Sequence, residues 1–84
     1  EQITILYVED DKNIQEQTKR PLQYLCSKLL LASDGKEAIE LYKQHKVDII
    51  ISDIKMPRLD GISMAKEIKK INPEQYIIFI SAHS

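Results

Sequence analysis

Four short apolar runs alternate along the chain with three longer segments in which apolar residues recur every three or four positions. The runs cover residues 3–8, 28–32, 47–53 and 76–80. Their length and composition are typical of strands, and the isoleucines of the third run indicate a strand that is buried on both faces. The intervening segments have the periodicity of amphipathic helices. This order predicts an α/β fold in which right-handed crossovers place helices on both faces of a parallel sheet.

The first predicted helix spans residues 12–26 and contains a proline. Asp11 is a suitable N-cap for it. Its expected inward-facing stripe comprises Ile14, Thr18, Leu22 and Leu25. Pro21 lies well inside the pattern and removes an internal hydrogen bond, so we expect a bend near this residue and not a break into two helices.

The second and third predicted helices begin at aspartates. Asp34, followed three residues later by Glu37, resembles a capping box, and Asp60 is suited to cap the third helix. Asn72-Pro73 ends that helix. The side chains expected to face inward are Ala38, Leu41 and Tyr42 in the second helix and Met64, Ala65, Ile68 and Ile71 in the third.

Carboxylates follow two of the predicted strands directly. The first strand ends at Glu9-Asp10-Asp11, and the third ends at Asp53. Neighbouring parallel strands end on the same edge of a sheet, where ligands of open α/β folds bind, so Glu9, Asp10 and Asp53 should converge. A packed cluster of three carboxylates repels itself and needs a cation or protons. The sequence therefore predicts a small metal site, with oxygen ligands suited to a hard cation such as Mg²⁺.

The composition of the chain argues against some classes of function but does not indicate a specific one. With 84 residues, the chain is at most one domain. The net charge of −1 gives no broad basic field, so we expect neither direct contact with nucleic acid nor a membrane partner. The single cysteine, Cys26, fits a reducing compartment, and no apolar run approaches the roughly 20 residues of a membrane span. We therefore expect a cytoplasmic location.

Several short motifs, taken in order, suggest a known family. They are Ile5-Leu6-Tyr7-Val8-Glu9-Asp10-Asp11, Ala32-Ser33-Asp34-Gly35-Lys36-Glu37-Ala38, Asp48-Ile49-Ile50-Ile51-Ser52-Asp53-Ile54-Lys55-Met56-Pro57, Leu59-Asp60-Gly61 and Ile80-Ser81-Ala82. Each motif alone is weak, but an acidic pair, Asp-x-x-Met-Pro and a strand-end hydroxyl in this order are highly specific. From end to end the chain resembles the receiver domain of two-component response regulators. The resemblance implies a flavodoxin-like doubly wound sheet with strand order 2-1-3-4-5, of which 2-1-3-4 is expected here.

The resemblance also implies roles for individual residues. Asp53 would be the phosphoacceptor, in a Mg²⁺-dependent reaction with a sensor histidine kinase or phosphotransfer protein. Asp10 would bind the metal directly, Glu9 through a water molecule, and Lys55 through its backbone carbonyl. Ser81 would supply a hydroxyl that contacts the phosphoryl group and switches conformation. The signal would then pass to an output domain or a downstream effector. Such a domain is not a conventional enzyme, although receivers catalyse their own phosphorylation and dephosphorylation.

Simpler roles remain open for the same residues. Asp10 and Asp11 could simply cap the first helix, with no role in binding a metal. Asp53 could be a turn residue, and Ser81 a solvated serine at a strand end. The Lys55 side chain could be solvated, or it could reach back to the acidic cluster and partly replace the metal.

The chain departs from the family pattern at its C-terminal end. A complete receiver would continue through a fourth helix, a fifth strand that carries a lysine and an aromatic residue, and a fifth helix. We therefore expect residues 1–84 to form a receiver domain that is incomplete at its C-terminus. The fourth strand should then be an exposed apolar edge that favours self-association.

Two other functions compete with phosphotransfer. The missing lysine suggests a receiver-shaped protein-interaction module that does not accept phosphate. A hydrolase of the haloacid dehalogenase type also uses an aspartate at a strand end. That class needs an acid two residues after the nucleophile, where this chain has Lys55, so we discount it.

Overall fold

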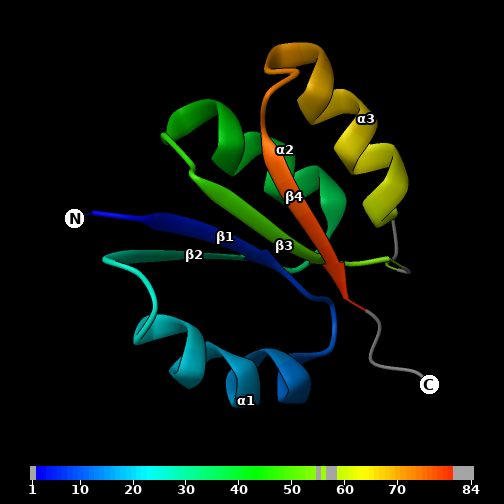
Figure 1. Cartoon of the computed structure of the whole chain (residues 1–84). Helices are drawn as coiled ribbons and strands as arrows, with labels where there is room; N and C mark the ends of the chain where they lie inside the picture. Colours follow the sequence, from blue (N-terminus) through cyan, green and yellow to red (C-terminus); the bar gives the residue numbers. More distant parts are fainter. Residues whose placement is uncertain (1, 55, 57–58, 81–84) are drawn as a thin grey trace.

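The computed structural model describes residues 2–54, 56 and 59–80, which form one four-stranded sheet flanked by three helices (Figure 1). In chain order the elements are β1 (Thr4–Val8), α1 (Lys12–Gln23), β2 (Lys28–Ala32), α2 (Gly35–Gln44), β3 (Ile49–Asp53), α3 (Gly61–Ile71) and β4 (Tyr76–Ile80). The strand order is β2-β1-β3-β4, and every neighbouring pair is parallel. The predicted fold class and strand order are confirmed. The described helices include none that is long and apolar enough to cross a membrane.

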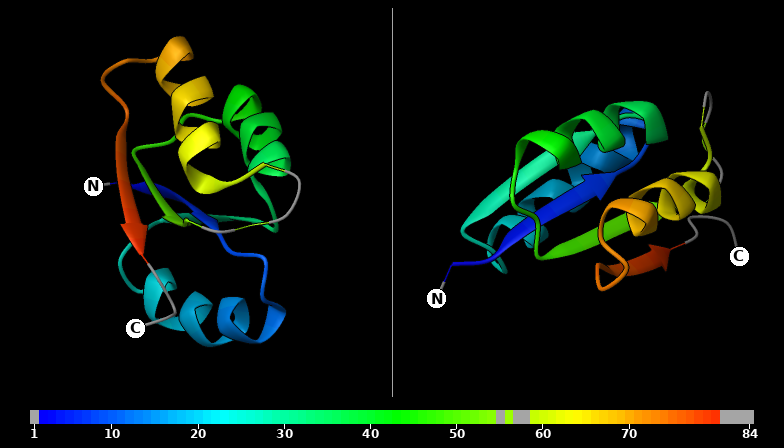
Figure 2. Two further views of the ribbon diagram at one scale, coloured as in Figure 1. Left: turned by 90° about the vertical axis from the view of Figure 1, so that its right-hand side faces the viewer. Right: turned by 90° about the horizontal axis from the view of Figure 1, so that it is seen from above.

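The helices cover the sheet unequally. Figure 2 shows α1 alone on one face and α2 and α3 together on the other. Against the paired helices lies a core of buried side chains: Leu6, Val8, Ala32, Ala38, Tyr42, Ile50, Met64 and Ile68. Side chains alternate along a strand, so the intervening positions of β1 and β3 face α1. Glu9 continues the alternation of Ile5 and Tyr7, and Asp53 that of Ile49 and Ile51, which places both acids toward the α1 face.

All three predicted caps form. The Asp11 carboxylate accepts hydrogen bonds from the backbone N–H groups of Asn13 and Ile14, at 2.9 and 3.1 Å. Asp34 accepts from the N–H of Glu37 at 2.8 Å, and Asp60 from that of Ser63 at 2.8 Å. Each cap satisfies N–H groups that the first turn of a helix leaves free.

The first helix is shorter than predicted. It ends at Gln23, with Pro21 in its last turn, and Tyr24 is the C-cap. The predicted end at residue 26 was wrong, and Leu25 is 68% exposed where the stripe predicted an inward side chain. A helix that stops after Gln23 no longer carries Leu25 around to the sheet.

The outward position of Ile71 is a second correction. This residue ends α3 and is 52% exposed, whereas Met64 and Ile68 on the same helix are fully buried. The periodic pattern identified the correct face of α3. The last turn of the helix nevertheless leaves Ile71 largely exposed.

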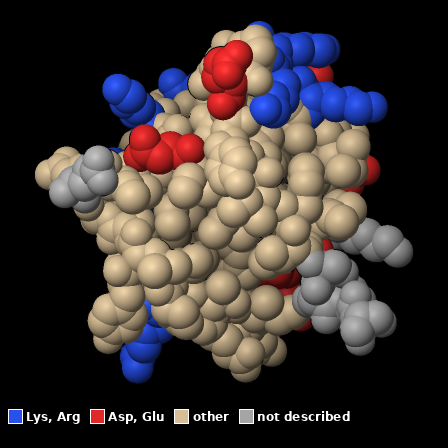
Figure 3. Space-filling view, viewed as in Figure 1, with Lys and Arg blue, Asp and Glu red and all other residues tan. Residues whose placement is uncertain are grey.

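β4 is the edge of the sheet in the described part of the chain, since it pairs with β3 alone. Its residues Tyr76, Ile78 and Ile80 are 63%, 38% and 37% exposed. Figure 3 shows an uncharged expanse on this side, with positive side chains gathered near the top of the view. The predicted exposed apolar edge is therefore confirmed for the described residues.

Candidate metal centre

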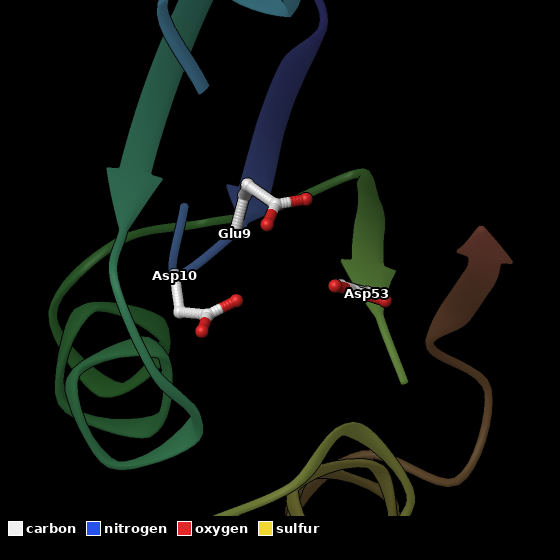
Figure 4. A group of neighbouring side chains, drawn as sticks. All are labelled: Glu9, Asp10 and Asp53. Atoms are coloured by element: carbon white, nitrogen blue, oxygen red, sulfur yellow. The ribbon is translucent and has the colours of Figure 1, made fainter. Parts of the chain in front are cut away.

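Three carboxylates meet at the carboxyl edge of the central strands. Glu9 and Asp10 follow β1, and Asp53 is the last residue of β3 (Figure 4). One oxygen of each lies within 4.8 Å of the others. The register explains the convergence, because Val8 is paired with Ser52, and one step further along both strands brings Glu9 beside Asp53. The convergence predicted from the strand ends is present.

Glu9 is restrained by hydrogen bonds and is almost completely buried, with 1% exposure. Its N–H donates to the carbonyl of Ala32 at 3.0 Å, and its Oε2 accepts from the N–H of Asp11 at 3.1 Å. Its other carboxylate oxygen, Oε1, is buried and has no hydrogen-bond partner in the described structure. A buried acceptor without a partner is costly unless something else binds it.

The electrostatics of the cluster act against the ionised form of Glu9. Burial raises the pKa of Glu9 above its ordinary value of 4.5, and the hydrogen bond from Asp11 offsets part of this change. The charges of Asp53 and Asp10 raise the pKa further. A cation between the three acids would reverse this preference, because it favours the ionised carboxylates.

Asp53 presents one oxygen to the backbone and one to the cluster. It is 7% exposed, and its Oδ1 accepts a hydrogen bond from the N–H of Ile54 at 2.7 Å. The hydroxyl of Ser52 donates to the Asp53 carbonyl at 2.7 Å. These bonds fix the backbone of Asp53 and one carboxylate oxygen, while Oδ2 accepts no hydrogen bond from the described residues.

Two glycines allow the segment after Asp53 to pack closely. A Cβ on Gly61 would lie 2.4 Å from the Asp53 carbonyl oxygen, and a Cβ on Gly35 would lie 2.4 Å from that of Leu59. Both glycines also donate backbone hydrogen bonds to this segment, Gly61 to Ile54 at 2.8 Å and Gly35 to Leu59 at 3.1 Å. At both helix starts glycine therefore meets a requirement for space.

These residues fit a hard divalent cation. Three carboxylates converge, and the partnerless Oε1 of Glu9 is an acceptor that a cation or its bound water would satisfy. Lys55 and Ser81, predicted to contribute a backbone carbonyl and a hydroxyl, lie outside the described residues.

Sequence reasoning missed Gln15, which lies beneath the cluster. This residue of α1 is 5% exposed, and its side-chain amide donates to the carbonyls of Glu9 and Ala32 at 3.2 and 3.3 Å. The apolar stripe predicted that the neighbouring Ile14 faces inward, but it made no prediction for Gln15. A glutamine one position away carries no signal that distinguishes it from a solvated residue.

Comparison with known proteins assigns the chain to a family. Residues 5–84 match the response regulator receiver domain. The chain belongs to this family. As a receiver domain it is a module of two-component signalling. Response regulator MprA of Mycolicibacterium vanbaalenii is 31% identical over 80 residues, which are 95% of this chain and 35% of that protein.

Solved receiver structures share the arrangement of the chain. Response regulator TrrA of Thermotoga maritima, solved in complex with Mg²⁺-BeF, is 35% identical with a TM-score of 0.89, over 98% of this chain and 71% of that one. The N-terminal domain of an uncharacterized Wolinella succinogenes protein is 38% identical with a TM-score of 0.89, covering 98% and 66%. TrrA has also been solved in complex with histidine kinase ThkA, where the match has a TM-score of 0.88 and 35% identity over 98% and 71%. The receiver chain thus spans about a third of the curated relative and about two thirds of these structures.

Proposed function

We propose that this receiver domain accepts a phosphoryl group on Asp53 in a Mg²⁺-dependent reaction and transmits the change to an output. The observation that carries the proposal is the convergence of Glu9, Asp10 and Asp53, with one oxygen of each within 4.8 Å of the others. Asp53 lies at the end of β3, with one carboxylate oxygen fixed by the backbone and the other available. The family assignment agrees with this site, and Mg²⁺-BeF is bound to the similar regulator TrrA.

The reaction requires charge neutralisation more than covalent help. A carboxylate is a poor nucleophile toward an anionic phosphoryl group, since both partners are negative. In the proposed step an oxygen of Asp53 forms a bond to phosphorus while the bond from phosphorus to the donor nitrogen breaks, and the donor leaves with that electron pair. Glu9, Asp10 and Asp53 would hold Mg²⁺, which would supply the charge neutralisation that the transfer requires.

We assign the roles within the cluster from the family resemblance, and the burial of each acid supports the assignment. We assign the exposed Asp10 as a direct metal ligand, and the buried Glu9, whose Oε1 has no hydrogen-bond partner in the described structure, as a ligand through a water molecule. The hydrogen bond from the N–H of Ile54 restrains the Asp53 carboxylate, which supports its assignment as the positioned nucleophile. We assign the backbone carbonyl of Lys55 as a further ligand and the Ser81 hydroxyl as the phosphate contact, on the family resemblance alone.

The proposed donor is a sensor histidine kinase or a phosphotransfer protein. The complex of TrrA with ThkA supports this, because the regulator in that complex shares the fold and 35% of the aligned residues. The recipient of the signal would be an output domain or a downstream effector.

Phosphorylation with acetyl phosphate and Mg²⁺ tests the proposal. We expect a base-labile phosphate that mass spectrometry maps to Asp53 and that is absent in Asp53→Asn. Asp60→Asn is the matched control, because it makes the same chemical change at an exposed helix cap and should leave labelling intact. Label that persists in Asp53→Asn, or that maps to Asp60, would refute the assignment.

A Ser81→Ala variant separates labelling from response. We expect phosphorylation to remain largely intact and the downstream output to weaken, since the proposed role of this hydroxyl lies in propagating the change. Normal signalling by this variant would make Ser81 an ordinary turn residue.

A further inference from the structure

We infer that Gln15 is a positioning residue for the acidic cluster: its side-chain amide fixes the peptide between Glu9 and Asp10 and so aims both carboxylates at the metal. The inference rests on the proposed Mg²⁺ site. It concerns a residue of α1 that itself contributes no ligand.

The amide of Gln15 bridges two strand ends. Nε2 donates to the carbonyl of Glu9 at 3.2 Å and to that of Ala32 at 3.3 Å. The same Ala32 carbonyl accepts the N–H of Glu9 at 3.0 Å. Both N–H groups of the amide are therefore used at the point where the pairing between β1 and β2 ends.

This bridge sets the direction of the two acids. The Glu9 carbonyl belongs to the peptide that links Glu9 to Asp10, so holding its oxygen fixes the plane of that peptide. The orientation of this plane fixes the position of the Asp10 Cα atom, from which its side chain extends. On the other side of the same turn, Asp11 donates its N–H to Oε2 of Glu9, which leaves Oε1 as the unpaired oxygen of that side chain.

α1 is anchored to the same turn. Asp11 caps the helix through its side chain, and its carbonyl accepts the N–H of Gln15 at 2.9 Å. Gln15 thus closes a loop of hydrogen bonds that runs from Glu9 through Asp11 and back. Two of the three acids and their support lie within seven consecutive residues, 9–15, so a shift of α1 would move Glu9 and Asp10.

The test compares four variants in the full chain by calorimetry with Mg²⁺. Gln15→Met keeps the length of the side chain and removes both donors. Gln17→Met makes the same change at an exposed position of α1, and Leu22→Ala removes a buried side chain of α1 that lies far along the helix from the cluster. Gln15→Ala is a second variant, because it leaves room for water to bind the two carbonyls if the methionine variant does not fold.

We expect removal of the Gln15 amide to weaken Mg²⁺ binding about 10-fold, the lower range for residues that orient metal ligands. Gln17→Met and Leu22→Ala should keep the wild-type Kd, although Leu22→Ala lowers the thermal midpoint. An unchanged Kd in both Gln15 variants would overturn the inference. An equal loss in Leu22→Ala would also overturn it, since the effect would then be one of general stability.

Amide hydrogen exchange without metal gives an independent readout. In the Gln15 variants the Asp11 amide should exchange faster relative to the Ile50 amide in the core, whereas Leu22→Ala should not change that ratio. An unchanged ratio in the Gln15 variants would contradict the inference. If the wild type bound no Mg²⁺, the proposed function would fail, and this exchange ratio would still decide whether Gln15 holds the turn.

Discussion

The two faces of the sheet are built for different purposes. Toward α2 and α3, Leu6, Val8 and Ile50 are fully buried against Met64 and Ile68. Toward α1, the same strands carry the buried acids at their carboxyl ends, and β4 leaves apolar side chains exposed. One face is closed by packing, whereas the other combines a helix, a charged site and a strand whose apolar side chains are exposed in the described part of the chain.

The two faces separate the packing that stabilises the sheet from the acids of the candidate metal site. Alternation along β1 and β3 places Val8 and Ser52 on the packed face and Glu9 and Asp53 on the other. The packed face can hold the strands in register while the acids on the opposite face repel one another. A site that destabilises itself without a cation depends on such a support.

The largest expected effect is the loss of a core side chain on the packed face. Ile50→Ala should cost about 2–5 kcal/mol of unfolding free energy, the range for large-to-small changes in a core. Ile78→Ala, on the open side of β4, should cost much less because that side chain is already 38% exposed. Denaturant unfolding of both variants measures the contrast, and equal losses would contradict it.

Metal addition should stabilise the α1 face next. Saturating Mg²⁺ at 100 times its Kd should add about 2.7 kcal/mol to the free energy of unfolding, and a chelator should remove this gain. Asp10→Asn and Asp53→Asn should lose most of the Mg²⁺ binding. Thermal melts with and without metal test this, and an unchanged Mg²⁺ affinity in both variants would exclude the site.

A smaller loss of stability is expected at the start of α3, where this helix of the packed face contacts the end of β3. Gly61→Ala would place a methyl group 2.4 Å from the Asp53 carbonyl and should cost about 1–3 kcal/mol through overpacking. Ala65→Gly is a useful comparison on the same helix, because it lowers helix propensity without the clash. If Gly61→Ala matched the wild type in thermal stability and Mg²⁺ affinity, the close approach would be unimportant.

The pH dependence of stability isolates the contribution of Glu9. Its pKa is higher in the folded protein than its ordinary value of 4.5, so the folded state binds the proton more tightly than the unfolded state. The stabilisation that protonated Glu9 adds to the free energy of unfolding is fully present below pH 4.5. It is lost as the pH rises through the pKa of Glu9 in the folded state. Glu9→Gln should flatten this fall in metal-free protein, as measured by thermal midpoints across that window. An identical pH profile would show that Glu9 is not the group responsible.

Changes in β4 should have the smallest effect on the stability of a single chain. Their main effect should be on self-association in concentrated solution. The uncharged edge of β4 should promote self-association of the 84-residue chain, and Ile78→Lys should reduce it. Light scattering on a chain verified by mass spectrometry to end at Ser84 measures this. A stable monomer over a wide concentration range would refute the prediction.

The sequence alone determined the architecture and the main acids. Short continuous apolar runs located the four strands, and period-3.6 patterns located the three helices. β2 and β4 are confirmed at their predicted bounds, β1 and β3 start one and two residues late, and α1 ends early. The strand ends identified Glu9, Asp10 and Asp53 as neighbours, because parallel strands end on one edge. These signals are local, so they are readable along the chain.

Only the tertiary structure decided what supports those acids. Whether Gln15 meets water or the carbonyls of Glu9 and Ala32, and whether Gly61 faces open space or the Asp53 carbonyl, depends on how α1 and α3 dock on the sheet. The exposure of Leu25 depends on where α1 stops. Periodicity reports which side of an element faces inward, whereas the distance between side chains far apart in sequence is set by packing.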